Sequence, residues 1–383
     1  MKQLLGEIVN DAFEPLFYRL QIEEDRKNYE ELINSKQPIK VFDQIESQLR
    51  ELINCLNPSK NITGDQITAF IDAHLDGCPR DEYGVWIYYP WTQGLVHVLD
   101  EAEFIEVRTN RNRNKITQAE QEILKTKAIG VVGLSVGQSI ALTIAMERVC
   151  GEIRLADFDT ADLSNLNRLR TGLHNLGLKK TIVAAREIAE IDPFIKVVIY
   201  NEGLTTDNMD DFFLQGGKLD LLVEVCDGLE TKVSSRIRAR ELLIPVVMDT
   251  NDRGMLDIER FDLEPTRPIL HGLVGDLRPE DIGGLSNREK IPLILKIVGA
   301  DTISDRLRAS MSELGKTLKN LPQLASSVVL GGAITTDAVR RILLNQFPHS
   351  GRYYIDTDLL ISDELNTQTT LRKQPQESLS ENL

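Results

Sequence analysis

The first eighty residues carry apolar side chains at the spacing of amphipathic helices. Apolar positions recur three or four residues apart there, which predicts helical segments that each bury one face. Residues 84–99 then turn to β-forming side chains on both sides of a short turn, which predicts a hairpin whose aromatic residues pack in a core. The stripe positions are Leu4, Leu5, Ile8, Val9, Phe13, Leu16, Phe17 and Leu20, then Val41, Phe42, Ile45, Leu49, Leu52, Ile53 and Leu56; the hairpin aromatics are Trp86, Tyr88 and Trp91.

From Lys127 to Asp249 the pattern changes to short apolar runs that alternate with helical periodicity. Runs that are apolar throughout are typical of strands covered on both faces. Their alternation with helices predicts an α/β fold with a doubly wound, mostly parallel sheet. The runs are AIGVVG, IRLAD, IKVVIY, LDLLVEV and PVVMD, and the helical patterns cover about 136–149, 178–190, 207–214 and 231–242.

Beyond this core, residues 255–263 place apolar positions among acids, which predicts a strand pair or an extended edge. Residues 286–347 are helical in pattern again. Residues 363–383 are polar and rich in Gln, Ser, Asn and Glu, which predicts a disordered tail. The predicted parts are a helical and hairpin region at 1–107, an α/β domain at 108–285, a helical extension at 286–362 and a tail at 363–383.

Composition narrows the class of protein. The 383 residues hold 44 Lys and Arg against 59 Asp and Glu, a net charge of −15, which argues against a general nucleic-acid binder. The four cysteines form no C-x-x-C pair, so neither a zinc site nor a redox motif is expected. The chain shows no signal-type start and no apolar run of membrane-spanning length. We therefore expect a reduced, cytoplasmic protein without a membrane span.

The first apolar run of the α/β region ends in VVGLSVG, ahead of helical periodicity. Gly133 and Gly137 bracket this turn, and glycine permits a positive φ and lets a phosphate approach the backbone. The amides and the dipole at the start of the next helix favour an anion. Ser135 stands where a dinucleotide-binding turn has a second glycine. By itself the turn fits a phosphate site and a purely structural connection equally well.

Charged residues after the next runs strengthen a nucleotide interpretation. Asp157 lies 24 residues after the first glycine of the turn, close to the spacing at which an acid binds ribose. This spacing does not separate NAD, FAD and ATP. Asn165 and Arg168 follow in a segment rich in amide and guanidinium donors. Lys179 and Lys180 begin the next helix, where cations oppose the helix dipole and a bound triphosphate offsets that cost.

Asp227 ends the fourth apolar run, at the rim of the sheet where the other candidate residues are expected. A carboxylate at that place is suited to a hard cation such as Mg²⁺. The open alternative for all these residues is an ordinary strand-to-helix connection.

Residues 108–276 resemble the ThiF/MoeB/HesA family, whose adenylating domain is shared with ubiquitin-activating enzymes. The resemblance rests on VVGLSVG, on LADFDTADLSNLNR, on the lysine pair in GLKK and on VCDG. It implies a Rossmann-like domain that binds ATP and Mg²⁺, joins a substrate carboxylate to AMP and releases pyrophosphate. The implied substrate is a carboxylate, such as the C-terminus of a peptide or of a ubiquitin-like protein.

The resemblance also implies a role for each matching residue. Phosphorus centres need charge neutralisation and positioning rather than a protein nucleophile. Lys180 fits the family lysine better than Lys179, because it keeps the G-x-x-K spacing from Gly177. The implied nucleotide residues are Gly133, Ser135 and Gly137 in the phosphate turn, Asp157 on the ribose with Asp159 in the same motif, Asn165, Arg168 and Lys180 on the phosphates, and Asp227 on the metal. Arg168, Lys180 and Asp227 are also the implied catalytic residues.

The family further uses an arginine from upstream of the glycine turn, often from a neighbouring subunit. The basic run RTNRNRNK at 108–115 occupies that place, with Arg111 and Arg113 as equal candidates. The resemblance therefore implies a homodimer with shared sites. A solvated linker is the alternative interpretation of the same run.

Two classes of function stay open. The retained Asn165, Arg168, Lys180 and Asp227 favour an adenylating enzyme, with a tRNA-modifying member of the family as a variant that the net charge disfavours. Two departures favour a binding module that dimerises or docks a partner enzyme. The glycine turn is one residue shorter than the common family form, and Gly228 stands where the family has an asparagine. A dinucleotide oxidoreductase is a further interpretation, weaker than the adenylating enzyme, its tRNA-modifying variant and the binding module.

Three other residues are expected to have mainly structural roles or are left open. Cys226 closes an apolar strand and is expected to be buried, so no thioester is predicted. His271 is expected to be structural rather than catalytic. Arg253 is assigned to a surface ion pair or to a substrate carboxylate with equal weight.

Overall fold

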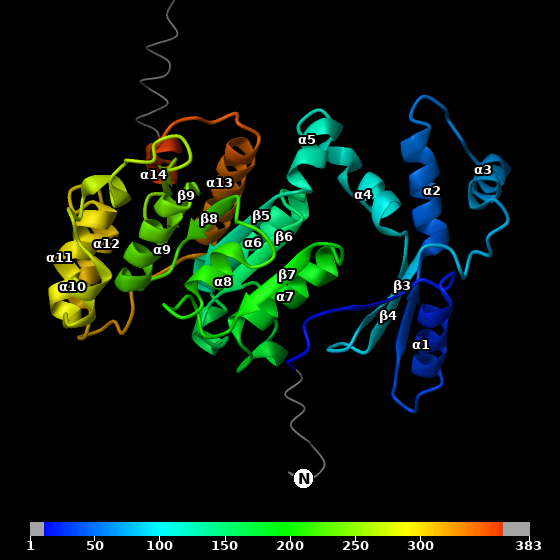
Figure 1. Ribbon diagram of the computed structural model, residues 1–383, viewed down its shortest axis with the longest axis horizontal. Helices are drawn as coiled ribbons and strands as arrows, with labels where there is room; N and C mark the ends of the chain where they lie inside the picture. The colour runs from blue at the N-terminus through cyan, green and yellow to red at the C-terminus, as the bar shows by residue number, and fades with distance from the viewer. Residues whose placement is uncertain (1–10, 363–383) are drawn as a thin grey trace, which may run out of the picture. The chain divides into compact units, whose positions relative to one another are not determined.

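The computed structural model describes residues 11–362, apart from the side chains of residues 287 and 288. This part of the chain divides into two compact units. Unit 1 comprises residues 11–134, 141–166 and 170–220, and unit 2 comprises residues 135–140, 167–169 and 221–362. Figure 1 labels most of the helices and strands of both units.

Unit 1 begins with a four-stranded sheet of strand order β1-β3-β4-β2. Its strands are β1 (Leu16–Tyr18), β2 (Lys40–Asp43), β3 (Val85–Tyr89) and β4 (Gly94–Val98). The hairpin predicted at 84–99 is confirmed, because β3 and β4 pair antiparallel with Ile87 opposite Val96. Trp86 and Tyr88 are buried in a cluster with Tyr18, as expected of packing aromatics. β2 pairs parallel to β4 and forms one edge of the sheet.

The helical stripe predicted over the first residues is wrong at its described positions: Leu16 and Phe17 lie in β1, and Phe13 and Leu20 lie outside any helix. The strand then gains ladder hydrogen bonds from β3, with Leu16 opposite Tyr88. Tertiary pairing therefore overrides the helical spacing here. The stripe positions before residue 11 lie outside the described residues.

The second stripe divides between two elements. Val41 and Phe42 lie in β2, where they are 59% and 52% exposed. The rest of the stripe, from Ile45 to Leu56, forms α2 as predicted, and Leu49 and Leu52 are buried in a core shared with α3. The helices of unit 1 are α1 (Glu23–Ile33), α2 (Ile45–Leu56), α3 (Asp65–Leu75), α4 (Glu101–Thr109), α5 (Gln118–Leu124), α7 (Lys180–Ile191) and α8 (Met209–Leu214), with 3-10 turns η1 (Asn110–Asn112), η2 (Leu163–Asn165) and η3 (Leu173–Asn175).

The larger sheet has seven strands in the order β11-β10-β9-β8-β5-β6-β7. Unit 1 holds β5 (Ala128–Val132), β6 (Glu152–Ala156) and β7 (Lys196–Tyr200), which are parallel neighbours. Unit 2 holds β8 (Leu221–Glu224) and β9 (Val246–Thr250), also parallel, then β10 (Met255–Glu259) and β11 (Gly351–Tyr354). The predicted α/β fold with a mostly parallel sheet and flanking helices is confirmed, and its five predicted strands all form.

Burial explains why most of the parallel strands read as continuous apolar runs, although β7 at the edge of the sheet is only half-buried. Every residue of β8 is buried, and so is every residue of β5 after Ala128. The helical patterns between them form α6 (Leu134–Glu147), which has residues in both units, and α7, α8 and α9 as predicted. The helices of unit 2 are α9 (Leu229–Glu241), α10 (Pro279–Gly283), α11 (Asn287–Val298), α12 (Asp305–Glu313), α13 (Ala325–Leu343) and α14 (Thr357–Leu360), with the 3-10 turn η4 (Ile269–Gly272).

The end of the chain confirms part of the prediction. β10 pairs antiparallel with β9, as a strand pair beyond the parallel core. It is not the edge, because β11 pairs antiparallel with β10 and was missed. β11 has four residues, Gly-Arg-Tyr-Tyr, which are too few to show a period. The predicted disordered tail at 363–383 lies outside the described residues.

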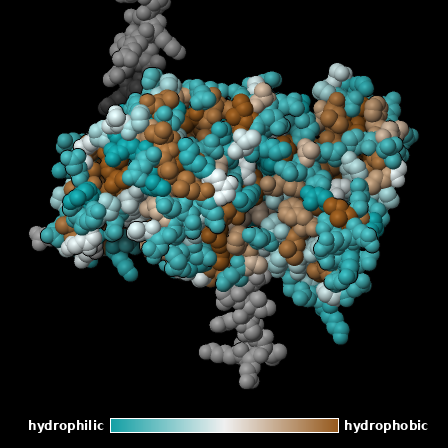
Figure 2. Space-filling model, in the orientation of Figure 1, coloured by the Kyte–Doolittle hydropathy of each residue, from teal (hydrophilic) through white to brown (hydrophobic). Residues whose placement is uncertain are grey.

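The surface is mixed in polarity. Figure 2 shows hydrophilic side chains over much of one face, with hydrophobic side chains in separate groups between them. Within residues 11–362, no helix is both long enough and apolar enough to cross a bilayer.

A glycine inside β5 gives a test of this packing. A Cβ added at Gly130 would lie 2.7 Å from Leu219 and 2.8 Å from Phe212, two fully buried side chains. We expect Gly130→Ala to lower the free energy of unfolding by about 1–3 kcal/mol, because the core must shift to admit the methyl group. Urea unfolding measures the change. Gly283→Ala is the control, since a Cβ there meets nothing within 4 Å. Equal stability of Gly130→Ala and the wild type would contradict this packing.

Candidate nucleotide-binding site

The predicted glycine turn joins β5 to α6. Gly133 follows the last residue of β5 and has φ +88, a left-handed conformation that residues with a Cβ rarely adopt. Its N–H donates to the carbonyl of Ala156 at 2.9 Å. α6 begins directly after it and runs for 14 residues. Ser135 and Gly137 lie in the first turn of this helix, so the amides of a long helix start at the predicted phosphate turn.

Asp157 ties this turn to the end of β6. Its carboxylate accepts the N–H of Leu134 at 2.6 Å and the N–H of Asp159 at 2.8 Å. Burial raises the pKa of Asp157, while these two amides and the charge of Lys180 act in the opposite direction. Sequence reasoning assigned Asp157 to a ribose. In the structure its oxygens hold the start of α6 and the segment after β6, a positioning contact that the spacing alone does not reveal.

Lys180 lies at the first position of α7 and is only 4% exposed. The ammonium group of Lys180 contacts the carboxylate of Asp159 at 2.7 Å. The main-chain N–H of Lys180 donates to the main-chain carbonyl of Asp159 at 3.0 Å. The predicted cost of a cation at a helix N-terminus is therefore offset by this ion pair. Lys179 differs, because its ammonium group donates to the carbonyl of Phe158. Lys180 is thus the lysine that shares a contact chain with Asp159, Asp157 and the glycine turn.

Arg168 and Asp227 belong to unit 2. Burial lowers the pKa of Arg168. The negative charge of Asp227 raises it, so the two side chains interact electrostatically. Arg168 also donates to the side chain of Asn167 at 2.9 Å. Asp227 is exposed and follows β8. Asn165, in unit 1, instead accepts the N–H of Asp162 at 3.0 Å and closes the turn η2.

The two upstream arginines lie at η1, after α4. Arg113 forms an ion pair with Glu106, whereas Arg111 is exposed. Within residues 11–362, no hydrogen bond or ion pair joins either arginine to the cluster of Asp157, Asp159 and Lys180. Within unit 1 the structure thus brings Asp157, Asp159 and Lys180 together without the two arginines, and within unit 2 the charge of Asp227 acts on Arg168.

These residues suit the groups that the predicted chemistry requires. A positive-φ turn before a long helix admits a phosphate, and buried Lys180 and half-buried Arg168 supply cations. Asp227 offers an exposed carboxylate, the donor that Mg²⁺ prefers. Among residues 11–362, no group of three or more His, Cys, Asp and Glu side chains is arranged to hold a metal by itself.

The predictions for His271, Arg253 and Cys226 have different outcomes. His271 is structural, because its Nε2 lies 2.9 Å from buried Asp257 and its Nδ1 lies 2.7 Å from Arg267. Arg253 forms an ion pair with Asp356 at 2.6 Å. Cys226 was expected to be buried, which is wrong in part: it is half-buried, because β8 ends before it and its side chain lines a cavity.

Buried ion pairs connect β8, the strand that precedes Asp227, to α9. Glu224 contacts Lys232 at 2.9 Å and Arg236, and Arg236 contacts Glu259 at 2.7 Å. Burial alone would raise the pKa of Glu224, but the charges and hydrogen bonds of Lys232 and Arg236 outweigh it and hold the pKa at about 2. Lys232 and Arg236 thus serve this structural network.

Sequence reasoning missed a cavity in unit 2 that has a volume of about 210 Å³. Asp227 and Cys226 line it, as does Asp249, the last buried residue of β9. Asp249 is 4% exposed, and neither of its oxygens has a hydrogen-bond partner among the described residues. Burial raises its pKa to about 7. The one sequence signal was a carboxylate at the end of the apolar run PVVM.

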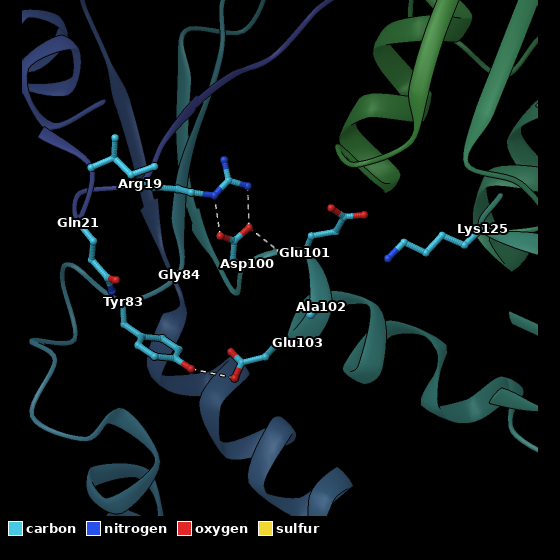
Figure 3. Close-up of a pocket in the computed structure, with 10 residues that line it drawn as sticks. Arg19, Gln21, Tyr83, Gly84, Asp100, Glu101, Ala102, Glu103 and Lys125 are labelled. Atoms are coloured by element: carbon cyan, nitrogen blue, oxygen red, sulfur yellow. Dashed lines mark hydrogen bonds and ion pairs between the residues drawn. The ribbon is translucent and has the colours of Figure 1, made fainter. Parts of the chain in front are cut away.

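A larger pocket, of about 610 Å³, lies in unit 1 (Figure 3). Several of its polar side chains are already paired. Arg19 donates two hydrogen bonds of 2.6 and 2.8 Å to Asp100. Tyr83 donates to Glu103 at 2.8 Å, and His74 contacts the same carboxylate. These contacts join α4 and the residue before it to α3 and to the segments after β1 and before β3.

Asp249 makes a testable contribution to stability. A carboxyl whose pKa is raised on folding stabilises the fold below its unfolded pKa and loses that stabilisation as the pH rises through the folded value. Wild-type stability should therefore fall between about pH 4 and pH 7, whereas Asp249→Asn lacks this loss. The difference between variant and wild type should grow by on the order of 3 kcal/mol from pH 4 to pH 8, measured by urea unfolding. A pH-independent difference would contradict the burial of an unpartnered carboxyl.

Comparison with known proteins agrees with this geometry. Residues 109–251 match the ThiF family. The Uncharacterized protein MT1398 of Mycobacterium tuberculosis (strain CDC 1551 / Oshkosh) is 46% identical over 271 residues, which are 71% of this chain and 38% of that protein. The Ubiquitin-like modifier-activating enzyme 5 of Bombyx mori is 30% identical over 129 residues, 32% of this chain and 33% of the enzyme. The chain thus spans little more than a third of these curated relatives.

Solved structures with similar folds include two from E. coli. The tRNA N6-threonylcarbamoyladenosine dehydratase TcdA, solved in complex with AMP, is 17% identical, with a TM-score of 0.46 over 65% of this chain and 98% of that one. MccB is 15% identical, with a TM-score of 0.45 over 82% of each chain. The family match covers the glycine turn, the Asp157 and Lys180 contacts, Arg168 and Asp227. Residues 109–251 of this chain are therefore a ThiF-family domain.

Proposed function

We propose that this ThiF-family domain activates a carboxylate with ATP: the carboxylate attacks the α-phosphorus, an acyl-adenylate forms, and pyrophosphate leaves. The observation that carries the proposal is that the family match at 109–251 includes every charged residue assigned to the nucleotide, from Asp157 to Asp227. The contacts among Asp157, Asp159 and Lys180 support it, because they order those groups before a ligand binds.

Each residue has a defined electrostatic task in this proposal. The amides at the start of α6 bind phosphate oxygens, and Gly133 allows the close approach. Lys180 exchanges part of its contact with Asp159 for a phosphate, and Arg168 neutralises charge that develops as pyrophosphate departs. Mg²⁺, held by Asp227, would supply further charge neutralisation when bound. Asn165 supports the loop that carries Arg168 through its turn with Asp162.

The proposal extends to a homodimer in which each site borrows an arginine. Arg111 is now the better candidate of the two, because Arg113 already pairs with Glu106. A carboxylate at the C-terminus of a peptide or ubiquitin-like protein remains a substrate class that the name of the Bombyx mori relative supports. Since this chain covers 33% of that enzyme, its partners do not transfer directly.

A second candidate is a docking module that no longer uses ATP. It is favoured by the ion pair of Lys180 with Asp159 and by the two amides that already occupy Asp157. Calorimetry with ATP, AMP, NAD and FAD, with and without Mg²⁺, separates the candidates. Binding of ATP supports the enzyme, whereas no binding of any nucleotide supports the module.

Exchange of labelled pyrophosphate into ATP tests the chemistry, given a carboxylate substrate. We expect Lys180→Ala and Asp227→Ala each to lose about 100-fold or more, because each removes a preorganised charge from the phosphates. Lys179→Ala is the matched control, since Lys179 contacts a main-chain carbonyl and no carboxylate of the cluster. Full activity of both site variants would remove them from the mechanism.

Subunit mixing tests the borrowed arginine. The double variant Arg111→Ala/Arg113→Ala and the variant Asp227→Ala should each be inactive alone, because each lacks a charge that the phosphates require. After subunit exchange, a heterodimer has one site with both groups intact, so a fraction of the activity should return. No recovery despite demonstrated exchange, or a monomer at micromolar concentration, would reject the shared site.

A further inference from the structure

The cavity of unit 2 combines an apolar wall with oxygen atoms that have no partner. Its wall includes Val136, Met255, Ile294, Ile297, Val298 and Ile303. Three of its polar lining residues are Asp249, Asn251 and Gln323, and each has a buried side-chain oxygen without a hydrogen-bond partner among the described residues. A buried polar group without a partner costs free energy, so four such oxygens around one cavity call for a ligand that donates hydrogen bonds.

Asp249 determines the sign of that ligand. An amide presents either its oxygen or its nitrogen, whereas an ionised carboxylate only accepts hydrogen bonds. Asp249 is 4% exposed, and both of its oxygens lack partners. Once ionised, as at pH 8, Asp249 disfavours an anion beside it, and a cation that carries several N–H donors fits its two open oxygens best. Lys232 also lines the cavity, but its ammonium group already contacts Glu224. An ammonium group has three such donors, one for each of the three residues.

The backbone around Asp249 is shaped to keep its carboxylate in place. α13 packs on β9, and Gly331 of this helix lies against the carboxylate. A Cβ at Gly331 would lie 2.2 Å from Oδ2 of Asp249, so only glycine leaves room for it. Asp252 provides a contrast on the same cavity wall, because its carboxylate already accepts the N–H and O–H of Ser304 at 2.8 and 2.5 Å.

The same cavity reaches the residues that the proposed function assigns to the chemistry. Asp227 lines it, and the main-chain carbonyl of Gln323 accepts the side-chain N–H of Asn167, which is bonded to Arg168. The volume of about 210 Å³ corresponds to roughly seven non-hydrogen atoms, at the 30 Å³ that each water occupies in the liquid. This is the size of a small amino acid.

Resting on the proposed adenylation, we propose that the substrate is a small amino acid with an apolar side chain. Its ammonium group is held by Asp249, Asn251 and Gln323, and its apolar body fills the cavity. Its carboxylate, on the same carbon as the ammonium group, stays near these residues and reacts beside Asp227, which lines the same cavity. The cavity therefore selects a free amino acid over a carboxylic acid that lacks the ammonium group.

Calorimetry on the full chain at pH 8 tests the cavity without any reaction. Isobutylammonium is the probe, and isobutanol is its neutral counterpart of the same shape. We expect the cation to bind about 10–100-fold more tightly than the alcohol, because it makes charge-assisted hydrogen bonds. Asp249→Asn should abolish that preference, whereas Asp252→Asn should keep it. Equal binding of cation and alcohol, or an unchanged preference in Asp249→Asn, would overturn the inference.

A second variant keeps the test valid if Asp249→Asn does not fold. Gln323 is half-buried between α12 and α13, so Gln323→Ala leaves the strands intact. It removes one acceptor and should weaken isobutylammonium several-fold without changing isobutanol. Unchanged binding of the cation would count against the inference.

Pyrophosphate exchange then separates this inference from the proposed function. L-valine should support exchange at least ~10-fold better than isovalerate, its analogue without the ammonium group, and Asp249→Asn should erase the difference. Exchange with equal rates for both acids upholds adenylation and overturns the amino-acid site. Asp249-dependent binding of isobutylammonium without any exchange upholds the cation site and rejects adenylation.

Discussion

The carboxylate of Asp157 is the constraint on which the arrangement of the candidate nucleotide residues depends. It joins the first amide of α6 to the segment after β6, and Asp159 in that segment reaches Lys180 at the start of α7. Three elements are thereby fixed by side chains that come from a single stretch of three residues. The hydrogen bond from Leu134 to Asp157 is buried, and the ammonium group of Lys180 is buried although its partner Asp159 is half exposed. Order at the phosphate turn is thus built into the protein before any ligand arrives.

Unit 2 uses buried charge in a different way. Glu224, Arg236 and Glu259 neutralise one another between β8, α9 and β10. Asp249, on the neighbouring strand, has no such partner. The contrast indicates that the fold has the means to pair a buried acid and leaves this one open. A polar group retained at a cost to stability is typical of functional sites.

The sequence predicted the parallel strands and the glycine turn, because these depend on local patterns. Continuous apolar runs need burial on both faces, and Gly133 needs a positive φ. β1 and β11 were missed because each has only three or four residues and forms through pairing with a distant strand. The cavity around Asp249 was missed for the same physical reason. Its walls come from segments more than 150 residues apart, from Val136 to Gln323, and no period in the sequence encodes how they meet.

The edge formed by β2 carries a consequence for the behaviour of the protein in concentrated solution. An open strand with outward apolar side chains is a template on which a second chain can add in register. β2 has only four residues, and Lys40 and Asp43 flank its exposed Val41 and Phe42. The opposite edge, β1, has three residues. Short edges with charged ends offer few ladder hydrogen bonds to an incoming strand. The sheet therefore resists fibrillar growth, although the side chains of Val41 and Phe42 stay exposed.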